Sequence, residues 1–289
     1  MNIQPDRQAL ITTEPLPRTS PQTWQNQAAQ TANAARKILA GYTPIDLAEM
    51  DAVALLRRVD TKYILHSQQL FQALTALSNR YRILDVQGGR LNRYHNLYFD
   101  TPEFQLYHQH HRGQRDRYKV RSREYVDTRL AFLEIKRKNN RDQTIKNRLQ
   151  TGALVTDLAP NTAAFLADHY PFDTGQLQPV LWNDFLRITL VSQQAVERLT
   201  LDINLSFSNG WEQVGLPGLA VAEVKQDGFS IHSAFIQQMR VMKVAPQRFS
   251  KYCLGISRFY PQVKANRFKR RSLMVERVLR RGVNHEYAF

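Results

Sequence analysis

From about Tyr81 to Lys225 the chain alternates apolar and polar residues with a period of two, which is the spacing of a half-buried β-strand. The clearest runs are 94–99, 118–125, 130–138, 185–191, 199–207 and 219–225. A helical spacing of apolar residues marks 45–57, 67–77, 161–168 and 230–242 instead. Ser67 stands where the second of these helices would be capped. The pattern therefore predicts an α+β chain.

The two ends of the chain differ from this middle part. Residues 1–42 are rich in Gln, Thr, Pro, Ala and Asn, which predicts a flexible segment with a short helix at 24–39. Residues 264–281 are dense in Lys and Arg, with Glu276 the one acidic residue among them. Since neither an internal repeat nor a Gly-Ser linker divides the chain, we expect a flexible segment over 1–42, one domain over 43–262 and a basic tail over 263–289.

The net charge of the chain limits the kinds of partner that it can have. Forty Lys and Arg residues against 25 Asp and Glu residues give a net charge of +15, which costs self-repulsion unless an anionic partner relieves it. Nucleic acid, an anionic membrane surface and a phosphate-rich molecule all fit this surplus. The single cysteine, Cys253, excludes an internal disulfide framework and is expected in the core. No apolar run is long enough to span a membrane, so a cytoplasmic location is expected.

Strand alternation places many charges on common faces. Lys119, Arg121 and Arg123 share one face of their strand, and Glu134 and Lys136 share a face of the next. A solvated basic sheet face would also alternate. Like charges directly opposite one another destabilise a sheet, however, so the density of charge here favours a groove that binds a polyanion and a cation.

Further carboxylates fall on polar strand faces. Asp202 shares its face with Thr200 and Asn204, and Glu223 shares its face with Lys225. Phosphoryl transfer suits such a site, because Arg forks and Lys ammonium groups bind phosphate oxygens while carboxylates hold Mg²⁺ or Mn²⁺. The sequence contains neither of the glycine-rich phosphate-binding motifs, G-x-x-x-x-G-K-[ST] and G-x-G-x-x-G. Any phosphates would therefore be bound by side chains.

Two other features have plainer interpretations. His108, His110 and His111 lie near Arg112 without the carboxylates that usually support metal-binding histidines, which favours a polar loop. The basic tail favours a solvated helix, with docking on an anionic membrane or an acidic partner as the alternative.

Eight short motifs carry a resemblance to a known family. In chain order they are RVDTKY (58–63), LYFDT (97–101), KVRSR (119–123), LEIK (133–136), IKNR (145–148), LTLD (199–202), AEVK (222–225) and FSKY (249–252). This series, from about residue 50 to 258, resembles the VTC domain, the polyphosphate polymerase domain of the triphosphate tunnel metalloenzyme superfamily.

The resemblance implies an antiparallel eight-stranded β tunnel barrel with flanking helices. It also implies transfer of the ATP γ-phosphate to polyphosphate, with Mn²⁺ or Mg²⁺ as cofactor. The residues that it places in catalysis are Lys119, Arg121, Arg123, Lys136 and Lys251. Those that it places in substrate binding are Arg58, Lys62, Lys146, Arg187, Arg198, Lys225 and Arg248. The metal ligands are expected to be Glu223 and Glu134.

Two departures shape the expected function. The wider superfamily opens with Glu-x-Glu-x-Lys, whereas residues 58–62 here offer only Asp60, which favours a polymerase over a hydrolase. The SPX domain and membrane helices of eukaryotic relatives are missing, so a separate membrane protein, or the inner membrane surface reached through the basic tail, is a candidate partner. The alternatives are a triphosphate hydrolase and a non-catalytic polyanion-binding module. Nucleic acid is disfavoured as a partner, because carboxylates on its binding face would repel phosphate.

Overall fold

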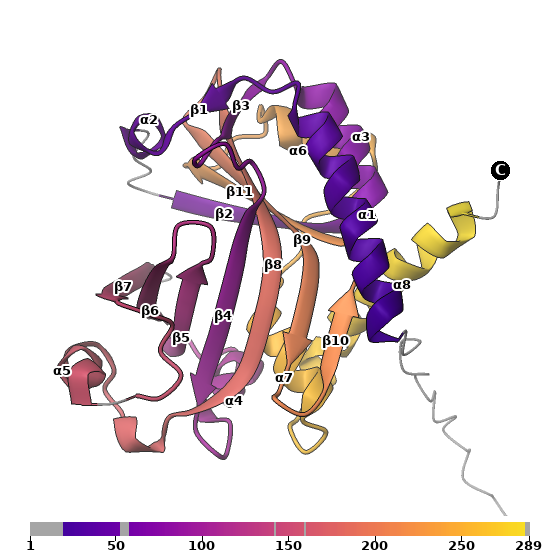
Figure 1. The fold of residues 1–289 in the computed structure, drawn as a ribbon. Helices are drawn as coiled ribbons and strands as arrows, with labels where there is room; N and C mark the ends of the chain where they lie inside the picture. Colours follow the sequence, from indigo (N-terminus) through magenta and orange to yellow (C-terminus); the bar gives the residue numbers. More distant parts are fainter. Residues whose placement is uncertain (1–19, 53–57, 142, 159, 287–289) are drawn as a thin grey trace, which may run out of the picture.

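The computed structural model describes residues 20–52, 58–141, 143–158 and 160–286 (Figure 1). A long antiparallel sheet organises the chain, and each strand on its main path pairs antiparallel with the next. In spatial order the path is β2 (Arg58–His66), β11 (Leu219–Asp227), β9 (Glu197–Ser208), β8 (Gln178–Ser192), β4 (Asn92–Asp100), β5 (Arg117–Tyr125), β6 (Leu130–Lys138) and β7 (Thr144–Thr151). The predicted α+β class with an antiparallel sheet is confirmed.

Three short strands extend this path. β1 (Pro44–Ile45) pairs in parallel with β3 (Tyr81–Leu84), which also pairs with β8, and β10 (Gln213–Leu216) forms a hairpin with β9. β2 and β7 stand at the two ends of the path, and within the described ranges they do not pair with each other. The eight-stranded path is therefore an open sheet.

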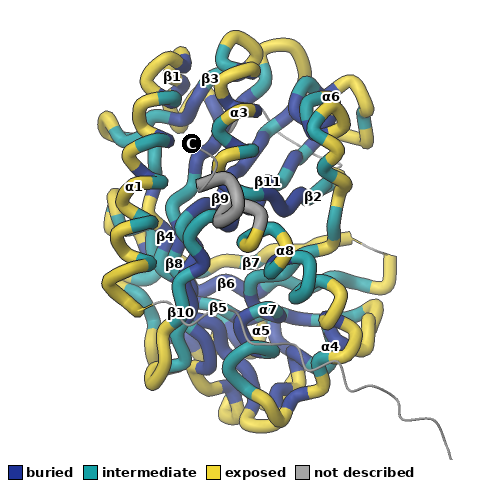
Figure 2. Tube along the Cα trace, turned by 90° about the vertical axis from the view of Figure 1, so that its right-hand side faces the viewer, coloured by how far each residue is buried: buried dark blue, intermediate teal, exposed yellow. Residues whose placement is uncertain are grey.

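Three helices cover the outer face of β2, β11 and β9 (Figure 1). They are α1 (Pro21–Leu39), α3 (Ser67–Leu77) and α6 (Ala234–Val241). Their apolar sides pack on Leu199, Leu201 and Ile203 of β9, which alternate with polar residues as predicted. Figure 2 shows the same layering, with buried strands inside and exposed loops and helix surfaces outside.

The short helix predicted at 24–39 is present as α1, but it packs on the sheet and so is not part of a flexible segment. It begins at Pro21, where the Ser20 side chain accepts a hydrogen bond from the Thr23 amide, and its residues Ala35 and Leu39 are fully buried. The apolar side of this helix is made mainly of alanines, so the composition of the segment conceals how much of it is packed. Residues 1–19 lie outside the described part of the chain.

A second outer layer lies at the other end of the sheet. Helix α5 (Pro160–His169), followed by the short helix η1 (Thr174–Gln176), packs its Leu166 against Val120, Leu133 and Ile135 of β5 and β6. These three strand residues point away from the charged face, as their alternation predicts. The charged residues of β5 and β6 are thereby directed to the inner side of the sheet.

The inner side is apolar at one end. Ile64, Leu219 and Val221 belong to a cluster with Tyr252 and Ile256 of α7 (Lys251–Phe259). The helices α4 (Gln105–Arg112), η2 (Asn266–Phe268) and α8 (Lys269–Glu286) add further residues to this cluster, as do β4, β8, β9 and β10. These helices therefore fill one end of the inner face, and the charged residues occupy what remains.

The packing of α8 bears on the basic tail. Met274, Val275, Val278 and Leu279 join the inner apolar cluster. Val275 is buried and the other three are partly buried against the protein, so this side of α8 is not a free apolar face for a membrane. No helix within the described ranges is long and apolar enough to cross a bilayer.

A bulge in β9 changes which side chains face inward. Asn204 has a φ of 54°, and its amide donates to the Ala28 carbonyl of α1 at 2.7 Å, so it does not share the face of Asp202 as predicted. Beyond it, Leu205 and Phe207 join the inner cluster instead of the outer one. The extra residue reverses the alternation for the rest of the strand.

Several predicted boundaries also shift. The helix expected at 45–57 is described only as α2 (Leu47–Ala52), because Ile45 is drawn into β1 beside Leu84; residues 53–57 lie outside the described ranges. Helix α3 has the predicted bounds, but His66 rather than Ser67 caps it. The loop expected around His108–Arg112 is helix α4. The helix expected at 230–242 is the shorter α6.

We predict that Gly215→Ala destabilises the fold by detaching α1. A Cβ atom on Gly215 would lie 2.4 Å from the Trp24 ring, so the indole of α1 would have to move. Overpacking of this kind costs about 1–3 kcal/mol, which urea unfolding would measure as a lower free energy of unfolding. Gly152→Ala is the matched control, because nothing lies within 4 Å of its added carbon. Equal unfolding free energies for the two variants would contradict this packing.

Candidate functional site

The charged part of the inner face is built by strand register. Lys119 of β5 lies opposite Lys136 of β6, which in turn lies opposite Lys146 of β7. The neighbouring row holds Arg121, Glu134 and Arg148 in the same order. The register thus concentrates positive charge in this part of the sheet, where three lysines directly across from one another repel.

Asp202 of β9 anchors one group of cations. Arg187 of β8 donates to both of its carboxylate oxygens, at 2.6 and 2.8 Å, and Lys251 at the start of α7 donates to one of them. Burial alone would raise the pKa of Asp202, but the charges of Arg187 and Lys251 outweigh it and hold that pKa well below the usual range. The carboxylate thus stays ionised and fixes both cations.

Glu134 of β6 anchors a second group. Arg121 donates to its carboxylate from Nε and Nη2, at 2.7 and 2.6 Å, and Lys146 forms a further ion pair with it. Burial opposes ionisation of Glu134, yet Arg121, Arg123 and Lys146 hold its pKa well below the usual range. The pKa of Lys146 falls to about 8, because burial outweighs the attraction of Glu134.

Aromatic and amide side chains hold the remaining arginine of β5. Arg123 donates to Asn96 Oδ1 at 2.7 Å, and its guanidinium lies 4.9 Å from the centre of the Tyr94 ring. Arg187 lies 4.7 Å from the centre of the same ring. The Tyr94 ring therefore makes a cation–π contact with each of two arginines.

Glu223 of β11 anchors the third group. Lys62 Nζ lies 3.1 Å and Lys225 Nζ 3.5 Å from its oxygens. Lys225 also donates to Thr200 Oγ1 at 2.7 Å. Burial would raise the pKa of Glu223, but Lys225 and Lys62 and a hydrogen bond with Asp60 hold it well below the usual range.

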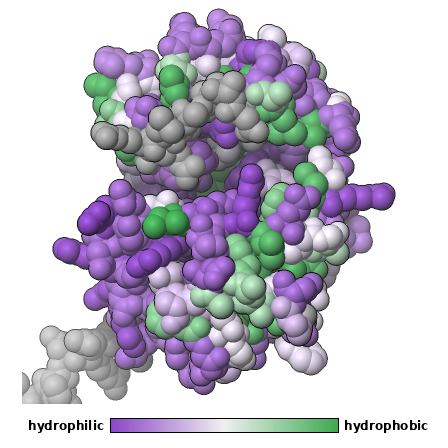
Figure 3. Space-filling model, turned by 90° about the vertical axis from the view of Figure 1, so that its left-hand side faces the viewer, coloured by the Kyte–Doolittle hydropathy of each residue, from purple (hydrophilic) through white to green (hydrophobic). Residues whose placement is uncertain are grey.

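The two ends of the sheet face each other across this site. Lys136 of β6 experiences the charges of Lys62 and Asp60 of β2 and of Glu223 of β11, although these strands lie far from β6 in the sheet order. The sheet must therefore curl around a shared interior. Figure 3 shows a hollow across this side of the molecule, with hydrophilic side chains along much of its lower border.

Lys136 differs from the other cations of this interior. Its side chain makes no hydrogen bond or ion pair with the described residues. Burial, followed by the charge of Lys119, lowers its pKa to about 7, despite the opposing effect of Glu223. Lys136 is therefore the lysine whose charge state would respond most to an incoming anion.

The start of α7 is fixed to the same interior. Lys119 Nζ donates to Ser250 Oγ at 2.9 Å, and Ser250 also caps α7 by accepting from the Cys253 amide. The next residue but one, Tyr252, donates to the buried carboxylate of Asp100, which in turn accepts from the first amides of α4. The positive end of the α7 backbone is thus directed toward the lysines.

Not all of the predicted residues join this interior. Arg198 of β9 donates to the Met50 carbonyl at 2.8 Å, which ties it to α2. Arg248 is exposed in the segment before α7. Arg58 begins β2, but its side chain lies outside the described part of the chain. The other predicted cations converge on this interior.

Residues that the sequence alone did not assign complete the site. Tyr98 OH lies 3.5 Å from Arg121 Nη1, and although burial would raise the pKa of Tyr98, the charges of Arg121 and Lys119 lower it. Ser250, Asn96 and Asp60 were likewise unassigned. Ser250 and Asp60 fall inside the FSKY and RVDTKY motifs, so these motifs could have identified them as site residues. Asn96 could be placed in the site only from the observed strand pairing. Cys253 is buried in the inner cluster, as predicted.

The carboxylates fit a metal only in part. Within the described ranges no group of three or more His, Cys, Asp or Glu side chains could hold a metal. Magnesium sites often use one or two carboxylates and complete the shell with substrate phosphates and water. Glu223, with Asp60 hydrogen-bonded to it, fits that donor set. Arg121 Nη2 lies 2.6 Å from Glu134, closer than the 3.1 and 3.5 Å that separate Lys62 and Lys225 from Glu223, so Glu134 suits charge balance better than metal binding.

Comparisons with solved structures give weak likenesses. A proposed adenylate cyclase from Bacillus halodurans has a TM-score of 0.46 and 16% identity, covering 71% of this chain and 100% of that chain. A proposed adenylyl cyclase from Hippeastrum, described as having a dominant triphosphatase activity, has a TM-score of 0.44 and 14% identity, covering 69% and 95%. A protein from Pyrococcus horikoshii has a TM-score of 0.41 and 12% identity, covering 69% and 96%.

The sequence comparison is more extensive. No curated protein matches the chain. The family model of the VTC domain, in contrast, matches residues 57–260 of this chain. That range contains every strand of the main path from Arg58 onward and the start of α7, and hence the three carboxylates and the cations that they anchor. The chain belongs to the VTC domain family.

Proposed function

We propose that this protein is a polyphosphate polymerase that transfers the γ-phosphoryl group of ATP to the end of a polyphosphate chain. The observation that carries the proposal is the convergence of cations from β2, β5, β6, β7, β8, β11 and α7 on one interior. Phosphoryl transfer depends mainly on positioning and on neutralising charge, and this interior supplies both.

The reaction needs little from the protein beyond this field. An oxygen of the terminal phosphate attacks the γ-phosphorus, the bond from that phosphorus to the bridging oxygen of ADP breaks, and ADP leaves with the electron pair. Arg121 and Arg187 are held by Glu134 and Asp202 in fixed orientations, so their remaining N–H groups can meet phosphate oxygens without reorganising. Lys119 and Lys136 add point charges beside them.

A divalent cation, Mn²⁺ or Mg²⁺, has a place in this scheme. Glu223, with Asp60 beside it, would hold the cation together with phosphate oxygens of the substrate. When bound, it would neutralise part of the charge on the transferred group.

The donor set also favours a polymerase over a triphosphate hydrolase. Hydrolysis requires activation of a water molecule, usually by a general base. Glu134, Asp202 and Glu223 are each engaged by cations and hold depressed pKa values, which makes them poor bases. A phosphate chain end is already an anion at neutral pH and needs no base.

A direct test is to incubate the purified protein with ATP labelled at the γ-phosphate and Mn²⁺ or Mg²⁺, and to separate the products by chain length. The proposal predicts labelled polymer together with ADP. Labelled orthophosphate without polymer would show a hydrolase, and unchanged ATP would show a binding module. Either result would overturn the proposal.

We predict that Glu223→Gln separates binding from turnover. The amide keeps the shape but cannot replace a carboxylate at a metal, so metal-dependent turnover should fall on the order of 100-fold or more. Tripolyphosphate affinity, measured by calorimetry, should be retained or increase because a negative charge is removed. Glu212→Gln, an exposed change of equal charge in the β9–β10 turn, should alter neither quantity. Turnover of Glu223→Gln at the wild-type rate would remove Glu223 from the metal site.

We also predict that triphosphate binding takes up a proton at Lys136. Because the folded-state pKa of Lys136 is about 7, its amine is largely neutral at pH 8, and a bound anion would raise that pKa and protonate it. Tripolyphosphate affinity should therefore fall as pH rises above about 7.

Calorimetry at pH 8, in buffers of different ionisation enthalpy, measures the proton uptake. Lys136→Met should take up about one proton fewer on binding tripolyphosphate and should bind it more weakly, because the amine that would be protonated is gone. The substitution leaves no ion-pair partner unpaired among the described residues. Lys37→Met, on the exposed side of α1, is the control. Equal proton uptake by both variants would exclude Lys136 as the responding group.

A further inference from the structure

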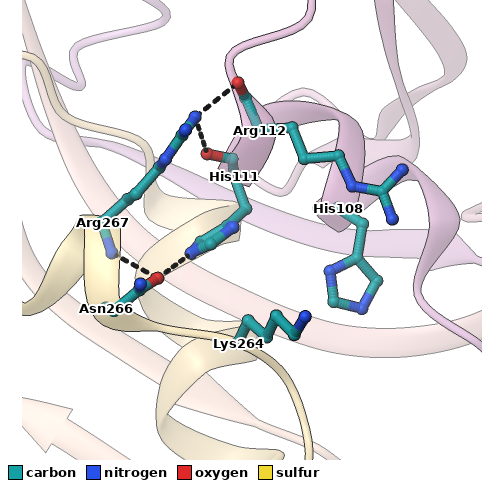
Figure 4. A pocket seen from close by; sticks show the side chains of 6 residues that line it. All are labelled: His108, His111, Arg112, Lys264, Asn266 and Arg267. Atoms are coloured by element: carbon teal, nitrogen blue, oxygen red, sulfur yellow. Dashed lines mark hydrogen bonds between the residues drawn. The ribbon is translucent and has the colours of Figure 1, made fainter.

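A second basic cavity lies outside the sheet interior, between α4 and the η2–α8 segment. Its volume is about 360 Å³, and its lining consists of His108, His111, Arg112, Lys264, Asn266 and Arg267 (Figure 4). None of these six residues is acidic. The predicted site residues include none of them, so the cavity is separate from the proposed catalytic interior.

Three of the six side chains hold the walls together. Arg267 Nη1 donates to the carbonyl oxygens of His111 and Arg112, at 3.3 and 2.5 Å. These carbonyls lie in the last turn of α4, where backbone acceptors lack partners within the helix. Asn266 Oδ1 accepts from His111 Nε2 at 2.7 Å and from the Arg267 amide at 2.9 Å. The two segments are thereby locked together, and the cavity between them has a fixed shape.

The other three side chains are available to a ligand. His108, Arg112 and Lys264 extend toward a common space in Figure 4, and their side chains make no hydrogen bond or ion pair with other described residues. Burial, followed by the charges of Arg112, His111 and Lys264, lowers the pKa of His108. Positive charge therefore accumulates in this cavity, whose lining contains no carboxylate. In the adjoining cavity that His108 and Arg112 also line, Asp116 is paired with Arg137.

Helix α4 separates this cavity from the sheet interior. His111 and Arg112 follow His108 by three and four positions, so all three lie on one side of the helix. His110 points to another side, where its Nε2 lies 3.0 Å from the Tyr118 carbonyl and its ring meets Tyr252. A ligand in the cavity and a ligand in the interior would thus occupy opposite sides of α4.

We propose that this cavity is an accessory binding site for a phosphoryl anion, such as pyrophosphate or the end of a polyphosphate chain. A guanidinium fork, an ammonium group and an imidazole that converge from two segments match the several oxygens and multiple charges of such an anion. The site does not depend on the proposed catalytic function, because its lining and its charge are independent of the sheet interior.

The test follows the imidazole signals of the full-length protein by NMR during titration with inorganic pyrophosphate. The signal of His108 is assigned by its loss in His108→Gln. We expect this signal to shift and to saturate. In Arg112→Gln/Lys264→Gln the apparent affinity should weaken by roughly tenfold or more, since two charge-assisted contacts are lost. Both substituted residues are exposed, so the fold should persist, which circular dichroism would check.

The matched control is Lys37→Gln/Arg141→Gln, which removes the same charge from exposed positions elsewhere. It should retain affinity within about twofold, because only long-range charge is lost. Titration with polyphosphate identifies the source of the anion: tighter binding than pyrophosphate indicates a chain, and equal binding indicates the terminal group alone. A His108 signal that does not saturate, or that saturates equally in both double variants, would overturn the proposal. A tunnel that proved inactive would leave the His108 result unchanged.

Discussion

The repulsion among cations on the inner face is the constraint on which the rest of this structure depends. Lys119, Lys136 and Lys146 lie directly across from one another, where like charges destabilise a sheet. The chain offsets this repulsion with Glu134, Asp202 and Glu223, each of which contacts two basic side chains. The offset is incomplete at Lys136, whose pKa is lowered first by burial and then by the charge of Lys119. A polyanionic substrate would supply the missing negative charge.

The surrounding architecture keeps this charged interior in place. Apolar residues of β2, β11 and β9 meet α7 and α8 at one end of the inner face, so the charged part is confined to the other. The start of α7 is joined to the lysines through Ser250 and to α4 through Tyr252 and Asp100. The cations are therefore oriented before a ligand arrives, which is the condition under which fixed charges accelerate phosphoryl transfer most.

Strand alternation was sufficient to predict which face of β5, β6 and β11, and of β9 as far as Ile203, carries charge, because successive side chains there point to opposite faces. It failed at Asn204, where a bulge reverses the alternation, and it did not mark β7, whose residues are mostly exposed and so lack an apolar face. Helix α4 was missed because His108–Arg112 is polar while its packed residues, Leu106 and Tyr107, lie at its start. Helix α1 was underestimated because alanines make up its buried side.

The composition of the site was more predictable than its geometry. The resemblance named the cations and Glu223, and the β5–β6 register brings Arg121 to Glu134. The ion pair of Lys251 with Asp202, in contrast, depends on how α7 packs against the sheet, which no local pattern encodes. The same holds for Arg198, which the alternation places on the charged face and which the structure ties to the Met50 carbonyl.

The effect of tripolyphosphate on the thermal stability of the wild-type protein, compared with that of sulfate at equal ionic strength, tests most directly whether the inner cations form a phosphate-binding site. If the interior is a preformed site for a phosphate chain, tripolyphosphate at 100 times its dissociation constant should add about 2.7 kcal/mol to the free energy of unfolding and raise the melting temperature by several degrees. Sulfate should produce only a small part of that shift. Equal shifts from the two salts would show that the inner cations act only as a diffuse charge, which would contradict a preformed site for a phosphate chain.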